Sequence, residues 1–137
     1  MKALQLITRS LRLLRVIDRA EAPEAEDAQA ALMALNAMMR RWEANGIALG
    51  WNALSDVQED LPIPPEAEEA IAYNLAVVLR PEYGATLDPD VIGLASGSLS
   101  ALRRDVKVAN PLQIDRGGGG YNIVADDYIG GLPVYTP

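Results

Sequence analysis

Two stretches of this chain decide the fold that its sequence predicts: LNAMMRRWEANGIALGW at Leu35–Trp51 and EAIAYNLAVVLRPEYG at Glu69–Gly84. In both, apolar residues recur three or four positions apart, which is the spacing of one face of an α-helix. In both, a glycine follows the last apolar turn, as it does where a helix ends in the left-handed conformation. We therefore expect two amphipathic helices, the first beginning near Pro23 and the second at Pro64-Pro65.

Two further helices are expected, at Ala3–Asp18 and at Pro89–Ala109. The apolar face of the last helix is formed by Ile92, Ala95, Leu99, Leu102 and Val106. Gly93 and Gly97 lie one turn apart in that helix, so we expect another helix to approach them closely. Asn74 interrupts the apolar face of the third helix, and its amide needs partners from a loop backbone or another helix end.

Composition favours one domain and removes several kinds of chemistry. The chain has 137 residues, half of them hydrophobic, and has no cysteine and no histidine. Thiolate and imidazole metal sites, cysteine nucleophiles and histidine-dependent triads are therefore excluded, and we expect no metal and no cofactor. No run approaches the roughly 20 apolar residues of a membrane span, so no membrane partner is expected. The predicted fold class is all-α, with a four-helix bundle in residues 1–110 and a long extended C-terminal tail in residues 111–137.

The tail differs in composition from the bundle. It has no helical periodicity, and Gly117–Gly120 is typical of a hinge. Its apolar residues are too numerous to leave in water. The candidate binding residues among them are Ile114, Tyr121, Ile123, Val124, Tyr128, Ile129, Leu132 and Tyr135. We interpret the tail as an arm that binds another molecule, with the composition to add a β-strand to that partner. A strand folded back on the bundle is the alternative.

Charge is distributed unevenly along the chain. The net charge is −7, yet residues 1–19 and 91–109 are basic while residues 20–90 are strongly acidic. An acidic body argues against a free-standing, tight DNA-binding protein, and separated charges suit a subunit that matches its neighbours. The candidate residues for a subunit interface or a DNA channel are Arg9, Arg12, Arg15 and Arg19 with Asp56, Glu59 and Asp60. The arginines would form one stripe on the first helix, and a solvated face is the alternative.

Residues 47–64 form a long connection, and connections of this length in a small domain are usually functional. Trp51 lies in this loop and either packs on the core or anchors a contact with another protein.

The sequence matches the known catalytic motifs poorly. RGGGGY at 116–121 lacks the lysine and the following helix of a phosphate-binding loop, and Gly97-Ser98 has no histidine for a nucleophile elbow. Two adjacent carboxylate pairs, Glu68-Glu69 and Asp126-Asp127, are interpreted as solvated faces. We expect that the protein is not an enzyme.

The two opening stretches carry a resemblance. The first contains Leu35, Ala37, Met38, Met39, Trp42, Gly46 and Ile47, and the second contains Asn74, Leu75, Ala76, Pro81, Glu82 and Tyr83. In order and spacing these residues resemble the head-to-tail adaptor proteins of short-tailed bacteriophages, also described as head-completion, packaged-DNA-stabilisation or tail accessory proteins. The resemblance covers about 4–109.

This resemblance implies a helical bundle that forms a dodecameric ring of identical copies below the portal protein. It implies that a C-terminal extension docks on the portal and that the other end receives the tail tube or nozzle protein. Trp51 would then be a tail-facing or loop anchor. Double-stranded DNA would pass through without sequence specificity. The location implied is the head–tail junction of the virion, after synthesis in the host cytoplasm.

Two other functions remain open at this point. One is a cell-wall (peptidoglycan) hydrolase that uses a carboxylate such as Glu66 or Asp127. The other is a small helical DNA-binding regulator with the first helix as its recognition element.

Overall fold

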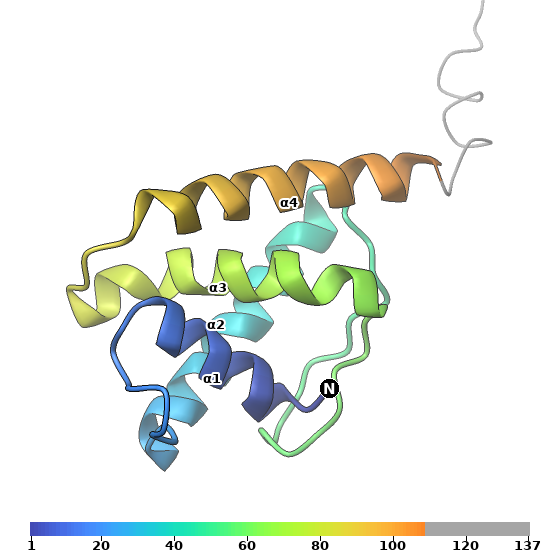
Figure 1. Ribbon diagram of the computed structural model, residues 1–137. Helices are drawn as coiled ribbons and strands as arrows, with labels where there is room; N and C mark the ends of the chain where they lie inside the picture. Colours follow the sequence, from blue (N-terminus) through green and yellow to red (C-terminus); the bar gives the residue numbers. More distant parts are fainter. Residues whose placement is uncertain (109–137) are drawn as a thin grey trace, which may run out of the picture. The chain divides into compact units, whose positions relative to one another are not determined.

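The computed structural model describes residues 1–108 and contains four α-helices in that part of the chain (Figure 1). They are α1 (Ala3–Leu13), α2 (Ala25–Ala44), α3 (Glu68–Tyr83) and α4 (Pro89–Val108), with a short 3-10 helix, η1 (Pro65–Ala67), before α3. The all-α prediction is confirmed for these residues. The predicted arm, its strand and all its candidate binding residues lie outside the described residues.

Helix α1 ends earlier than the sequence predicts. We expected it to run to Asp18, but it ends at Leu13, and Arg15 adopts the left-handed conformation with φ 59°. The Arg15 amide donates to the carbonyl of Arg12 (3.0 Å) and the Val16 amide donates to that of Leu11 (3.1 Å). This pair of bonds satisfies the last carbonyls of the helix and turns the chain away. The expected helix end was wrong because an arginine occupies the position where a glycine is usual.

The long loop after α2 completes the other end of α1. The Ala3 amide donates to the carbonyl of Glu59 (2.9 Å), and the Leu4 amide donates to that of Val57 (2.8 Å). The first amides of a helix have no partner within it, so these two bonds supply what a side-chain cap normally provides. The loop is therefore a structural part of the domain.

Helices α2 and α3 end at the glycines that the sequence predicts. Helix α2 ends at Ala44, Gly46 has φ 94°, and Ile47 folds back so that only 2% of it is exposed. Helix α3 ends at Tyr83, directly before Gly84 in the left-handed conformation.

The core lies where α1, α2 and α3 meet, within the compact unit Met1–Arg103. In Figure 1, α1 lies below α3 in the view, and α2 passes behind both of these helices. The fully buried large side chains come from all three helices and the following loop: Leu6, Ile7, Leu11, Leu32, Leu35, Met39, Ile47, Ile71, Leu75 and Leu79.

Helix α4 runs beside α3 in the opposite direction (Figure 1). The Asn74 amide nitrogen of α3 donates to the carbonyl of Ala95 in α4 (3.0 Å) and to that of Ala70 (2.7 Å). Its partner on α4 is thus a mid-helix carbonyl, where we expected a loop backbone or a helix end.

The buried face of α4 agrees with the predicted one in part. Ala95 and Leu102 are buried as predicted, whereas Ile92 is 50% exposed and Val91 is buried instead. A Cβ atom added at Gly93 or Gly97 would meet no atom within 4 Å. The expected close approach of another helix to these glycines is therefore wrong within the described part of this chain.

Candidate functional surfaces

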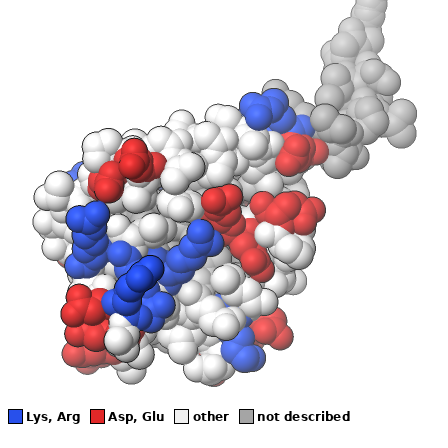
Figure 2. Space-filling view, viewed as in Figure 1, with Lys and Arg blue, Asp and Glu red and all other residues white. Residues whose placement is uncertain are grey.

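The four candidate arginines do not form one helical stripe. Only Arg9 and Arg12 belong to α1, since the helix ends before Arg15 and Arg19. The Arg9 guanidinium lies 5.4 Å from the centre of the Tyr73 ring, and Arg12 donates to the carbonyl of Glu21 (3.2 Å). Figure 2 shows basic side chains gathered over α1 and the segment that follows it, with acidic side chains around them.

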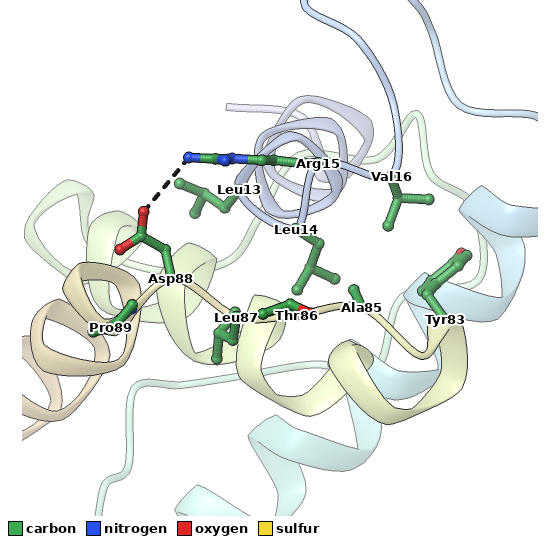
Figure 3. A pocket seen from close by; sticks show the side chains of 10 residues that line it. All are labelled: Leu13, Leu14, Arg15, Val16, Tyr83, Ala85, Thr86, Leu87, Asp88 and Pro89. Carbon is green, nitrogen blue, oxygen red and sulfur yellow. Dashed lines mark ion pairs between the residues drawn. The ribbon is translucent and has the colours of Figure 1, made fainter.

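A cleft of about 610 Å³ lies between the end of α1 and the connection from α3 to α4 (Figure 3). Its apolar walls include Leu14, Val16 and Leu87. At its edge the guanidinium of Arg15 lies 3.5 Å from the carboxylate of Asp88. Both side chains are accessible to solvent, so this ion pair contributes at most about 1 kcal/mol and leaves both groups able to exchange partners.

Tyr83 lines the same cleft from the last turn of α3. Burial raises the pKa of the Tyr83 phenol, and the charge of Asp27 raises that pKa further, together with a hydrogen bond between the two side chains. Asp27 lies in the first turn of α2, so the two side chains bring the beginning of α2 near the end of α3. The cleft thus combines an apolar floor, a phenol held in its neutral form and an ion pair at its edge.

The three candidate acids of the long loop have partners within the chain. The Glu59 carboxylate accepts from the amides of Ser55 (2.8 Å) and Asp56 (3.1 Å). The Asp56 carboxylate accepts from the Gln58 amide (2.9 Å). Asp60, whose side chain is 78% exposed, lies 3.8 Å from the Lys2 ammonium group. Of the three, Asp60 is the acid that accepts no hydrogen bond from a loop amide, so it can change partners without disturbing the loop.

Trp51 is half-buried and tied to α2. Its indole nitrogen donates to the Asn36 side-chain oxygen (3.1 Å), which also accepts from the Leu54 amide (3.0 Å), while the Asn36 nitrogen donates to the Leu54 carbonyl (2.9 Å). Asn36 therefore organises this part of the loop. Asn36 is not among the predicted site residues, although it is the polar residue within the otherwise apolar run Leu35–Met39.

The residues considered for catalysis are not brought together. Glu66 lies exposed on η1, and Glu69 is exposed at the start of α3. The Ser98 hydroxyl lies 2.6 Å from the Leu94 carbonyl of its own helix, as a serine on an ordinary helix does. Asp126 and Asp127 lie outside the described residues. Within residues 1–108 no three acidic side chains are grouped so that they could hold a metal ion.

None of the helices in the described part of the chain combines the length and apolar character that a bilayer crossing requires. No protein-family model matches the sequence, and no curated protein matches it.

Proposed function

We propose that this protein is a structural virion protein: a head-to-tail adaptor of a short-tailed bacteriophage. Its copies assemble as a ring under the portal protein, connect the portal to the tail and help to retain packaged DNA. Residues 111–137 serve as the portal-binding arm, and the helical domain makes the lateral contacts of the ring.

The observation that carries the proposal is the placement of the two motifs. Residues from the α2 motif and the α3 motif pack together in one core, and the exposed fractions of Leu35, Met39 and Leu75 are at most 1%. Gly46 and Ile47 end the first motif with a left-handed turn and a buried side chain. The spacing that resembles the adaptor family is therefore the spacing that this fold requires of its core.

The charge pattern supports the same proposal. Basic side chains cluster near α1, while most acids lie between α2 and the start of α4. Neighbouring copies held in register by the portal could match these opposite charges. Templating also raises the effective concentration of the copies, which turns weak lateral contacts into a closed ring.

The test is to mix the purified protein with the portal protein of the same phage and to examine the mixture by sedimentation and electron microscopy. We expect the free protein at micromolar concentration to be a monomer or a weak oligomer, and to form a ring on one end of the portal. A failure to bind the portal, or a stable dimer that binds DNA, would overturn the proposal. A closed ring formed without portal would contradict the templating step.

A further inference from the structure

Large apolar side chains remain exposed on two helices of the domain. Apart from Met1, those of the described residues are Met33 on α2, which is 67% exposed, and Ile92 and Leu94 on α4, which are 50% and 48% exposed. Both helices bury another face in the domain, so these side chains mark outward faces that no part of residues 1–108 covers.

The outward face of α2 is defined here as Glu26, Ala30, Met33, Ala37 and Arg40. These residues recur three or four positions apart, so they lie on one line along the helix. The line begins with an acid, ends with a base and carries only small side chains beside its central methionine. It therefore presents one large apolar projection between two opposite charges.

The outward face of α4 is defined as Asp90, Gly93, Gly97, Ser100 and Arg104. It also runs from an acid to a base. The residues before and after Gly93 point about 100° to either side of it, so Ile92 and Leu94 flank a floor of bare backbone. A Cβ atom at either glycine would meet nothing, so this floor is open to a side chain from another molecule.

The two faces match in length, charge and size. The acid and the base are 14 residues apart on each helix, which corresponds to about 21 Å. Laid antiparallel, the faces place opposite charges together at both ends, whereas a parallel arrangement would place like charges together. The antiparallel pairs are Asp90 with Arg40, Gly93 with Ala37, Gly97 with Met33, Ser100 with Ala30, and Arg104 with Glu26.

We propose that the outward face of α2 in one copy packs antiparallel on the outward face of α4 in the next copy, with Met33 seated on Gly97. If each face paired with the same face of another copy, the opposite charges would still meet at the ends, but the side chains would not fit. Two methionines would collide between two α2 faces, and two glycines would leave a gap between two α4 faces. A contact between different faces repeats from copy to copy, so it builds a ring or a chain. This interface rests on the ring of the proposed function.

Disulfide cross-linking tests the interface directly, because the chain has no cysteine of its own. We expect the double variant Met33→Cys/Gly97→Cys, oxidised at high concentration or on the portal, to form a ladder of covalent multimers that a thiol collapses. A mixture of the two single variants should stop at dimers. In the control Ala44→Cys/Gly97→Cys, the cysteine at position 44 is exposed on α2 but lies out of register with Gly97. This control should form far fewer cross-links.

Size and charge variants provide a second measurement. Gly97→Leu should fold with unchanged or higher melting temperature, because its own chain leaves the space empty, yet it should weaken lateral assembly at least tenfold. Arg40→Glu should weaken assembly as well, and Asp90→Arg should restore it in the double variant. Arg80→Glu, the same charge change on α3, is the matched control and should have little effect.

The outcomes separate this interface from the proposed function. If wild-type protein binds the portal but the double variant forms no ladder there, the interface is wrong and the adaptor function stands. If the ladder forms but the protein does not bind the portal, the interface stands and the adaptor function is wrong. Cross-linking of Met33→Cys alone that equals the double variant would show a symmetric contact and overturn the inference.

Discussion

The side-chain hydroxyl of Ser10 in α1 lies 2.9 Å from the backbone carbonyl oxygen of Ala72 in α3. Ser10 has no exposed surface and is the one buried polar side chain among the described residues. Both residues are small, and that lets the two helix backbones approach closely at their crossing. The hydroxyl has one proton, and the Leu6 carbonyl of its own helix is its more distant acceptor, at 3.2 Å.

Replacing Ser10 separates the hydrogen bond from the packing. Ser10→Ala should lower the free energy of unfolding by about 1 kcal/mol, which is roughly the worth of the lost hydrogen bond. The cost stays this small because the Ala72 carbonyl lies within α3 and keeps its backbone hydrogen bond there. Ser10→Leu should cost more, about 1–3 kcal/mol, because the added atoms force the crossing apart. Urea denaturation measures both, with exposed Ser100→Ala as the control. A Ser10→Leu variant as stable as the wild type would contradict this account of the crossing.

Asn74 holds α4 against α3 through the bond to Ala95. Asn74→Ala should reduce the protection of α4 amides from hydrogen exchange while leaving those of α1 and α2 protected. Asn74→Asp should be more disruptive, because it places a carboxylate against the carbonyl oxygens of Ala70 and Ala95. Equal protection of α4 in the Asn74→Ala variant and the wild type would show that the apolar contacts alone hold the helix.

Tyr83 makes stability depend on pH in the alkaline range. Its folded pKa is raised above the ordinary value of 10.0 by burial and by Asp27. The folded state therefore holds the phenolic proton more tightly than the unfolded state, so the stability gained is complete below pH ~10 and is lost as the pH rises through the folded pKa. We expect the free energy of unfolding to fall over that range.

Tyr83→Phe should remove this part of the pH dependence, and Asp27→Asn should reduce it by removing the neighbouring charge. The difference in tyrosinate absorbance between the wild type and Tyr83→Phe gives the pKa itself. The same alkaline slope of stability in Tyr83→Phe and the wild type would assign the effect to another group.

The helices could be predicted from the sequence because their apolar spacing and glycine stops are local signals. The end of α1 could not be predicted, because Arg15 adopts the left-handed conformation in which a glycine usually marks the end of a helix. The hydrogen-bond partners of the first amides of α1 could not be predicted either, since the carbonyls of Val57 and Glu59 come from a loop far along the chain. Contacts of this kind depend on the folded arrangement and leave no periodic trace in the sequence.

The buried face of α4 shows where periodicity is insufficient. The apolar residues Val91, Ile92, Leu94 and Ala95 spread over an arc of about 160° around the helix, so the pattern does not say which part of that arc meets the core of its own chain. The structure assigns Val91 and Ala95 to the core and leaves the other two exposed. The candidate arginines and acids were identified as charged surfaces, but their partners within the chain depend on turns that no local pattern predicts.

A charge reversal at Arg12 shows whether the candidate arginines set the register of neighbouring copies. If it contacts a neighbour's acids, Arg12→Glu should weaken ring assembly on the portal. Asp60→Arg should partly restore assembly, because this acid has a side chain that is 78% exposed and, unlike Asp56 and Glu59, accepts no hydrogen bond from the loop's own amides. If Arg12→Glu leaves assembly unchanged but particles lose DNA, the arginines face the channel instead, and the neighbour contact is wrong.

The arm provides the most direct test of the portal contact. Deleting residues 117–137 should leave the helical circular dichroism signal intact, because α4 ends at Val108. It should abolish assembly on the portal, because aromatic anchors such as Tyr121, Tyr128 and Tyr135 typically contribute more than ~2 kcal/mol each to an interface.

Alanine at these three tyrosines in the full-length chain is the finer variant, and it should weaken portal binding while leaving any lateral cross-linking of free protein unchanged. Replacement of Asp126 and Asp127 by asparagine is the matched control, since it alters the same segment without removing an aromatic ring. Sedimentation with the portal measures the binding of each variant. Binding by the truncated protein at undiminished affinity would show that the helical domain, and not the arm, contacts the portal.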